Sequence, residues 1–251
     1  MIGPFILMYH SIADHLDDPY SVPINAFRQQ ISWIFENGFD VVSLSCLLRS
    51  LQERNYRSLK KKLVITFDDG YQDFVTNALP ILHEHRATAT VFLVTGMLGE
   101  RASWNKSGAD ERLMSEEDVR SIKAHGISLG SHTATHANLT LLDHKEVRRQ
   151  LKDSSDKLAQ LGETFYAFSY PWGQWTSGIA DTVREEGYEC ALAVGEKTRL
   201  IAFNTHCLPR ITMGRAIDSK RFQTLLTRTH VEMELRRRFW ILRDKWSSLL
   251  R

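Results

Sequence analysis

Two short polar motifs contain the residue types of a metal-dependent hydrolase. Asp68 and Asp69 are adjacent, and His132 and His136 follow about sixty residues later in the segment Ser-His-Thr-Ala-Thr-His. Zinc binds imidazole nitrogen and carboxylate oxygen, and a catalytic zinc site has three protein ligands with room for a water. Two histidines and one aspartate would supply those ligands, which leaves the other aspartate free to take a proton from that water. The residue types therefore predict a divalent metal site with a general base beside it.

Each motif also has a structural interpretation. Asp68 and Asp69 could form a turn that caps the following helix, because aspartate is common there. Adjacent carboxylates repel, however, and a bound cation would hold both charged at neutral pH. His132 and His136 lie in a segment without an apolar face. Ligation or solvation is therefore favoured over packing in the core.

The elements that would position these motifs alternate between short apolar runs and longer segments of helical period. Such alternation is typical of a parallel sheet, either closed into a barrel or open and doubly wound. The expected strands are residues 5–9, 63–67, 89–94, 127–130, 165–170 and 190–194, and the expected helices are residues 25–36, 72–85, 115–124, 144–161 and 177–186.

The candidate residues all follow expected strands. The aspartate pair comes after 63–67, the histidine pair after 127–130, and His10 after 5–9. In α/β barrels, the loops at the C-terminal ends of the strands build the active site. We therefore expect these side chains to meet on one rim.

Composition limits the class of protein. The chain has 251 residues, of which 43% are hydrophobic and 25% charged, with a net charge of +2. These values are ordinary for a globular domain, and the weak charge gives no argument for nucleic-acid binding. No linker-like segment divides the chain, so one barrel over residues 1–230 is expected.

Location is predicted from the cysteines and the N-terminus. Cys46, Cys190 and Cys207 are far apart, which predicts neither a disulfide framework nor a cysteine zinc site and favours a reducing compartment. The first residues do not resemble a signal peptide, so a cytoplasmic protein is expected if Met1 is the native start. No apolar run is long enough to cross a bilayer, so any membrane contact would be peripheral.

Residues 231–251 predict a separate basic amphipathic helix. Its apolar residues form a stripe along one face of the helix, and such a stripe usually packs against its own domain or another subunit. The alternative is a helix lying on anionic lipid, because basic residues flank the apolar ones. The residues of the stripe are Leu235, Phe239, Leu242, Trp246 and Leu249.

The order and spacing of the motifs resemble those of the polysaccharide deacetylase family, also called the NodB homology domain or carbohydrate esterase family 4. The similarity extends from about Ile6 to Leu226 and includes features of the branch that acts on exopolysaccharides such as poly-N-acetylglucosamine. The motifs are Leu7–His10, Thr66–Gly70, Ser131–His136 followed by Asn138 and Leu139, Phe168–Gly173 and Leu208–Ile211.

The resemblance implies a single distorted (β/α)7–8 barrel that removes acetyl groups from sugar amides. It implies that Asp68 is the general base and that Asp69, His132 and His136 hold the metal. Zinc is the first choice, with cobalt, nickel and manganese as alternatives. It further implies that Thr133 fixes the histidine loop.

The resemblance also implies an acetyl pocket lined by Pro171 and Trp172, with Tyr170 beside them. The backbone N–H of Trp172 would stabilise the oxyanion formed during hydrolysis. Trp172 itself stands where many members of the family have tyrosine.

The sequence departs from the family pattern at two further places, both close to the general base. Ser169 stands where many members have an arginine that contacts the base, and Arg210 is the candidate replacement, with an exposed surface arginine as the alternative. The usual Leu-His of the general acid is absent, which leaves His10 and His206 as candidates because histidine titrates near neutrality. His10 has the better position at a strand end, and His206 the better place in chain order.

The preferred hypothesis is a metal-dependent deacetylase that hydrolyses the acetamide of N-acetylhexosamine units in a glycan or glycolipid precursor. One alternative is an esterase that removes O-acetyl groups from xylan-like glycans with the same metal and base. The other is a catalytically inactive barrel that only binds glycan.

Overall fold

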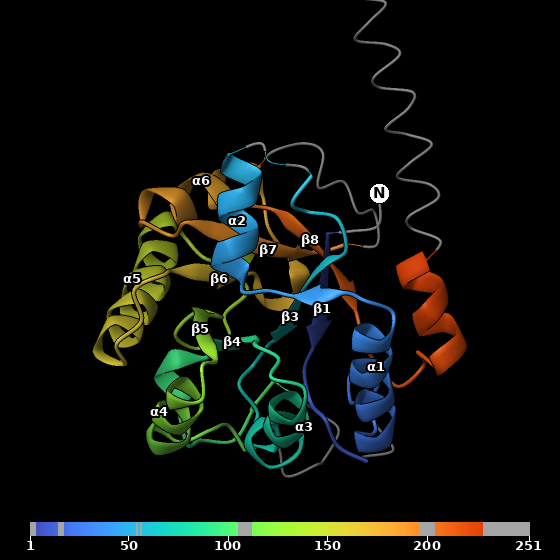
Figure 1. Ribbon diagram of the computed structural model, residues 1–251. Helices are drawn as coiled ribbons and strands as arrows, with labels where there is room; N and C mark the ends of the chain where they lie inside the picture. The colour runs from blue at the N-terminus through green and yellow to red at the C-terminus, as the bar shows by residue number, and fades with distance from the viewer. Residues whose placement is uncertain are drawn as a thin grey trace, which may run out of the picture.

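The protein folds around a closed parallel barrel (Figure 1). The computed structural model describes residues 4–14, 18–53, 55, 57–104, 112–195 and 204–227. Its strands are β1 (Phe5–Tyr9), β2 (Asp40–Val41), β3 (Lys62–Phe67), β4 (Thr90–Leu93), β5 (Ser128–Ser131), β6 (Ala167–Ser169), β7 (Cys190–Val194) and β8 (Leu208–Thr212).

Closure of the barrel depends on β1. The strand order is β1-β8-β7-β6-β5-β4-β3-β2, all pairs are parallel, and β1 also pairs with β3 along its whole length, from Phe5 with Leu63 to Tyr9 with Phe67. Seven of the eight strands thus form a ring. The short β2 adds only to the start of β3. The predicted barrel is therefore confirmed, and the open, doubly wound alternative is excluded.

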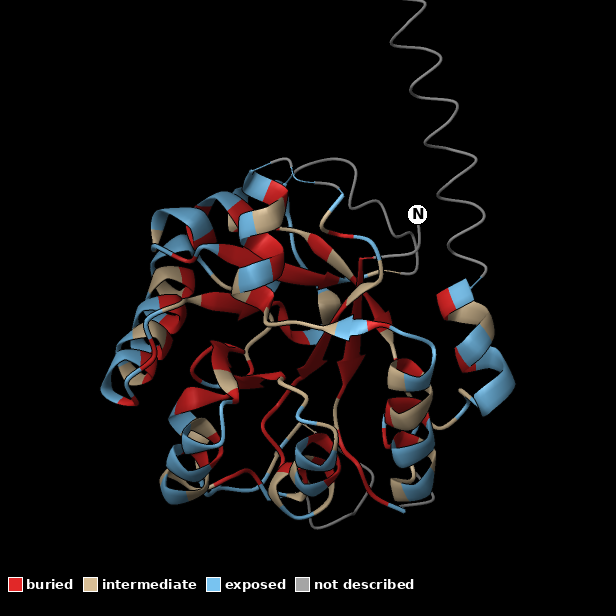
Figure 2. Cartoon of the chain, viewed as in Figure 1, coloured by how far each residue is buried: buried red, intermediate tan, exposed pale blue. Residues whose placement is uncertain are grey.

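Helices cover the outside of the barrel (Figure 1). Strand residues are mostly buried, whereas the helices alternate buried and exposed residues (Figure 2). This pattern explains the near-continuous apolar runs of the strands, which are covered on both faces. The helical elements are α1 (Ile24–Glu36), α2 (Leu44–Gln52), η1 (Phe74–Ala78), α3 (Leu79–Glu84), η2 (Thr95–Met97), α4 (Glu116–Ala124), η3 (Leu139–Leu141), α5 (His144–Gln160), η4 (Pro171–Gly173), α6 (Ser177–Glu185) and the helical residues 219–227.

Side-chain caps fix several helix starts. Ser43 caps α2, Asp143 caps α5 and Thr176 caps α6, each by accepting a backbone N–H in the first turn. Ser115 and Asp118 form a reciprocal capping box at α4. These contacts set where each helix begins relative to the strand that precedes it.

The structure differs from the sequence-based expectations in a few elements. The helix expected over 72–85 is present as a continuous helical segment from residue 73 to 84, but its first part is a π-helical turn, η1, that precedes α3. Pro80 has no N–H to donate, and the Leu79 N–H bonds to the Phe74 carbonyl five residues earlier, which is π-type geometry. The sequence did not predict β2, α2, β8, the helical residues 219–227 or the short 3₁₀ turns η2, η3 and η4.

Other expectations concern the membrane, the cysteines and the C-terminus. Within the described ranges, no helix combines the length and apolar character needed to cross a bilayer. Cys46, Cys190 and Cys207 are free thiols. The helix expected over 231–251, with its predicted membrane or subunit contact, lies outside the described residues.

Candidate active site

A cavity of about 410 Å³ opens where the strands end. Its lining residues come from loops that follow different strands of the barrel, as expected for this architecture. The candidate residues that line it are His10 after β1, Asp68 and Asp69 after β3, His132 and His136 after β5, and Tyr170 and Trp172 after β6.

Asp69, His132 and His136 come together at the floor of this cavity. Their potential ligand atoms all lie within 4.8 Å of one another. Asp69 Oδ1 is 3.4 Å from His132 Nε2 and 3.3 Å from His136 Nε2. The same oxygen is buried and has no hydrogen-bond partner within the described part of the chain. Because a buried carboxylate oxygen without a partner is costly, this donor set fits a divalent cation.

The two imidazoles present their Nε2 atoms for ligation. His132 Nδ1 lies 2.8 Å from the Ser169 carbonyl oxygen, so this nitrogen carries the proton and Nε2 keeps its lone pair. Burial lowers the pKa of His136 to about 3. His136 is therefore neutral at neutral pH, which is the form that binds metal.

Trp104 contacts two members of this cluster, His136 and Asp69. Its ring stacks on His136 at a centroid distance of 4.1 Å, and its Nε1 donates to Asp69 Oδ2 at 3.4 Å. The indole thus occupies one carboxylate oxygen and leaves the other facing the histidines. Sequence patterns did not single out Trp104, because it lies in a loop outside every recognised motif.

The backbone of the site is strained. Asp69, Thr133, His136 and Trp172 have φ values of 71°, 66°, 57° and 60°, and these are four of the six non-glycine residues with positive φ in the described ranges. Each such conformation costs on the order of 1 kcal/mol or more and persists only where neighbouring contacts hold it. Thr133 supplies such contacts, because its carbonyl accepts the Thr95 N–H and its Oγ1 accepts the Ala137 N–H.

Asp68 has a very different environment. The Nη1 and Nη2 atoms of Arg210 donate to its two carboxylate oxygens at 2.7 and 2.6 Å, and the Ser169 hydroxyl donates to Oδ2 at 3.0 Å. Arg210 is fully buried and also donates to Ser169 Oγ and Thr66 Oγ1. Burial by itself would raise the pKa of Asp68, but the charge and hydrogen bonds of Arg210, together with the nearby imidazoles of His132 and His10, outweigh burial and hold that pKa well below its usual range. Asp68 is therefore a fixed, charged carboxylate at neutral pH.

The two candidates for the general acid lie in different places. His10 lines the cavity, and its buried Nδ1 has no hydrogen-bond partner among the described residues. His206 does not line the cavity; its Nε2 contacts the Tyr188 carbonyl at 2.8 Å and its Nδ1 contacts Thr205 Oγ1 at 3.3 Å. Both ring nitrogens of His206 are thus engaged in local structure.

The loop after β6 forms one wall of the cavity. Trp172 is 55% exposed, and its Nε1 donates to the His136 carbonyl at 3.3 Å. The Tyr170 hydroxyl is directed elsewhere, because it donates to the His206 carbonyl at 2.8 Å. Pro171 is buried beneath the loop and does not line the cavity itself. Asp18 and Tyr20 also line the cavity, and no motif indicated either of them.

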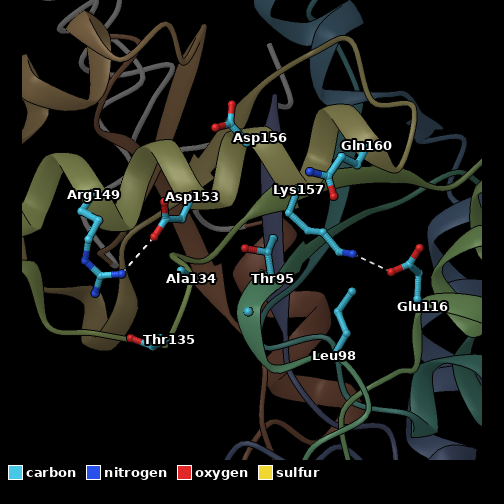
Figure 3. A pocket seen from close by; sticks show the side chains of 11 residues that line it. Thr95, Leu98, Glu116, Ala134, Thr135, Arg149, Asp153, Asp156, Lys157 and Gln160 are labelled. Atoms are coloured by element: carbon cyan, nitrogen blue, oxygen red, sulfur yellow. Dashed lines mark hydrogen bonds and ion pairs between the residues drawn. The ribbon is translucent and has the colours of Figure 1, made fainter.

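A second, larger cavity of about 670 Å³ lies beside α5 (Figure 3). Its charged side chains are all in ion pairs: Arg149 lies 2.9 Å from Asp153, Lys157 lies 2.5 Å from Glu116, and Asp156 pairs with Lys152, which lies outside the lining. Ala134 of the histidine loop forms part of its wall, but the histidines do not line it. Because its charged groups are already paired, the smaller cavity is the candidate active site.

Comparisons with known proteins identify the family of this chain. Residues 55–191 match the family model described as polysaccharide deacetylase. The Bacillus subtilis protein YxkH is 28% identical over 188 residues, covering 73% of this chain and 62% of that protein. The poly-β-1,6-N-acetyl-D-glucosamine N-deacetylase of Escherichia coli K12 is 26% identical over 263 residues, covering 90% of this chain and 39% of the relative. The chain thus spans less than two thirds of the length of either relative.

A solved structure supports the same fold. The Streptococcus pyogenes deacetylase PplD in complex with acetate has a TM-score of 0.74 and 25% sequence identity. The match covers 88% of this chain and 97% of that one.

Proposed function

Because this chain belongs to the polysaccharide deacetylase family, we propose that it is a metal-dependent enzyme that releases acetate from N-acetylhexosamine units. The observation that carries the proposal is the contrast within one cavity: Asp69 Oδ1, beside two histidines, has no hydrogen-bond partner among the described residues, while Asp68 is held charged by Arg210. The first group suits a cation and the second suits a base. Together they supply what hydrolysis of an unactivated amide requires.

Asp69, His132 and His136 would hold the divalent metal. Zinc suits two imidazoles and a carboxylate, with cobalt, nickel and manganese as alternatives. Such an ion supplies an activated water and polarises the acetamide carbonyl. The protein contributes rigidity, because His132 is oriented by the Ser169 carbonyl and Asp69 by Trp104.

Asp68 would accept the proton of the attacking water. Arg210 and Ser169 hold its two oxygens, so the carboxylate does not need to reorganise during the reaction. Arg210 is in this account a positioning residue, which acts on the reaction only through Asp68.

His10 would protonate the leaving amine. It lines the cavity, and its Nδ1 has no hydrogen-bond partner in the part of the chain that the structure describes. His206 keeps both ring nitrogens on Tyr188 and Thr205, so we rank it second. An amine leaves poorly without a proton, and a histidine near neutrality is suited to supply one.

The acetyl group would lie against the loop after β6. Trp172 and Tyr170 line that side of the cavity, and the buried Pro171 fixes the turn between them. The Trp172 backbone N–H would stabilise the oxyanion, in line with the positive φ that sets the direction of this peptide.

The proposed substrate is an N-acetylated glycan or a glycolipid precursor. The E. coli relative is named for poly-β-1,6-N-acetyl-D-glucosamine, which supports an N-acetylglucosamine unit. An O-acetyl glycan esterase would use the same metal and base, but the histidine in the cavity favours amide hydrolysis, because an alkoxide depends less on a proton donor than an amine does. A cytoplasmic location stays a prediction.

An acetate assay over a panel of glycans tests the proposal. Oligomers of N-acetylglucosamine, chitin-like, peptidoglycan and lipid-linked substrates, and O-acetyl xylan would be compared with and without a chelator. We expect acetate from N-acetylated substrates, loss of activity with the chelator, and recovery when Zn²⁺ is restored. Acetate from O-acetyl xylan alone would replace the proposal by the esterase, and no acetate from any substrate would favour a barrel that only binds glycan.

A further inference from the structure

We propose that Asp18 and Tyr20 form a recognition subsite for the sugar ring that carries the reacting acetamide. This inference rests on the proposed function. It gives a role to a part of the cavity lining that no motif indicated, to which both residues contribute.

Tyr20 offers an exposed aromatic face at the cavity. Its side chain is 50% exposed, although most large apolar side chains of the barrel are buried. Trp172, at 55% exposure, is the other strongly exposed aromatic residue in the same lining. Exposed apolar rings at a concave site typically mark a binding surface, and an aromatic face matches the apolar C–H face of a pyranose.

Asp18 adds a polar group to the same lining. Its side chain lines the cavity, yet the residue is only 5% exposed. Oδ1 accepts the Tyr20 N–H at 2.9 Å, and in the described part of the chain no lysine, arginine or histidine forms an ion pair with this carboxylate. An ionised carboxylate can only accept hydrogen bonds, and it offers more acceptor positions than one N–H occupies. Sugar hydroxyls are donors that fit the remaining positions.

The segment that carries both residues is held in place before any ligand binds. The Pro19 carbonyl accepts the Arg215 N–H at 3.1 Å, and the Ser21 hydroxyl donates to the Ala13 carbonyl at 2.7 Å. Gly214 allows the chain after β8 to approach, because a Cβ there would lie 2.4 Å from the Pro19 oxygen. A preorganised subsite loses little entropy when the ligand binds.

The position of Tyr20 indicates which part of the substrate it would contact. Its ring lies 4.9 Å from the ring of His10, the proposed donor to the leaving amine. The amine is attached to the sugar, whereas the acetyl group lies on the Trp172 side. Tyr20 and Asp18 therefore face the sugar ring and not the acyl group.

Steady-state kinetics on an N-acetylglucosamine oligomer test the subsite in the full-length, zinc-loaded protein. We expect Tyr20→Ala and Asp18→Asn each to raise KM about tenfold and to change kcat less than about twofold. Tyr20→Phe keeps the aromatic face and should restore KM to near the wild-type value. Leu141→Ala is the matched control, because Leu141 is an 80% exposed apolar residue outside the cavity lining.

A second substrate separates sugar recognition from damage to the reaction. For an aryl acetate, which has no sugar ring, the selectivity ratio of glycan to ester kcat/KM should fall about tenfold in Tyr20→Ala. A fall in kcat with unchanged KM would mean that Tyr20 acts only by positioning His10, and it would overturn the inference. Unchanged KM for both variants would also overturn it while the proposed function stands. Failure of the wild-type protein to release acetate from any glycan, with aryl acetate still hydrolysed, would overturn both.

Discussion

Asp68 and Asp69 are neighbours in the chain, and both are nearly buried, with exposures of 2% and 5%. Their surroundings are nevertheless opposite. Asp68 has hydrogen bonds to both oxygens from Arg210 and Ser169, whereas Asp69 Oδ1 has none from any described residue. The positive φ of Asp69 turns its side chain away from its neighbour and towards the histidines. Equal residue types at adjacent positions thus acquire different chemistry from the groups that surround them.

The two aspartates should also differ in how they affect the stability of the folded protein. A buried ion pair contributes little net free energy of folding, but a single buried charge left without its partner is strongly destabilising. The Asp68–Arg210 pair is complete within the protein. The Asp69 cluster is complete only with a cation, so its stability should depend on metal, as binding to the native state always adds stability.

Removing Arg210 should have the largest effect on the stability of the protein. Arg210→Met leaves the Asp68 charge buried and unpaired, and we expect the free energy of unfolding to fall by about 3–5 kcal/mol in urea denaturation. The double variant Asp68→Asn/Arg210→Met removes both charges and should recover much of that loss. If the single and double variants were equally unstable, the loss of stability could not be assigned to an unpaired Asp68 charge.

The same variant carries a prediction for pH. The Arg210 charge lowers the pKa of Asp68, so its removal should raise that pKa. The base would then become protonated at a higher pH, and the acid limb of the kcat/KM profile should move upward in pH. An unshifted limb would show that Arg210 does not control the ionisation of the base.

A smaller effect is expected at Asp69, where Trp104 orients the carboxylate. Trp104→Phe keeps an aromatic ring against His136 but removes the Nε1 donor to Asp69 Oδ2. Groups that orient a ligand typically contribute a factor of about 10–100 in metal affinity, and we expect a loss near the lower figure. Competition with a chromophoric zinc chelator measures it. Affinity equal to the wild type would reduce Trp104 to a packing residue.

The sequence predicted the positions of the main candidate residues because the strand ends of a parallel barrel share one rim. Asp68 and His132 each follow a buried strand directly, and Trp172 comes three residues after the end of β6, so local patterns were sufficient to place them together. The strand β8 was missed because Pro209 interrupts its apolar run, and β2 because it has only two residues. Neither gives a periodic signal.

Contacts between distant residues were harder to predict. Arg210 and Asp68 are 142 positions apart, and Arg210 was singled out only through the family resemblance. Trp104 and Tyr20 lie in irregular segments where side-chain direction depends on the packed barrel, so no spacing rule could place them in the cavity. The sequence indicated the residues for the reaction, whereas their supporting partners required the structure.

Metal stoichiometry in two matched variants tests the division of roles most directly. Asp68→Asn and Asp69→Asn replace neighbouring carboxylates by the same amide, and each purified protein would be assayed for bound zinc and for acetate release. We expect Asp68→Asn to retain one zinc per chain while kcat falls by a factor of about 10²–10⁴, and Asp69→Asn to lose both zinc and activity. Loss of zinc from Asp68→Asn, or full retention in Asp69→Asn, would contradict the assignment of base and ligand.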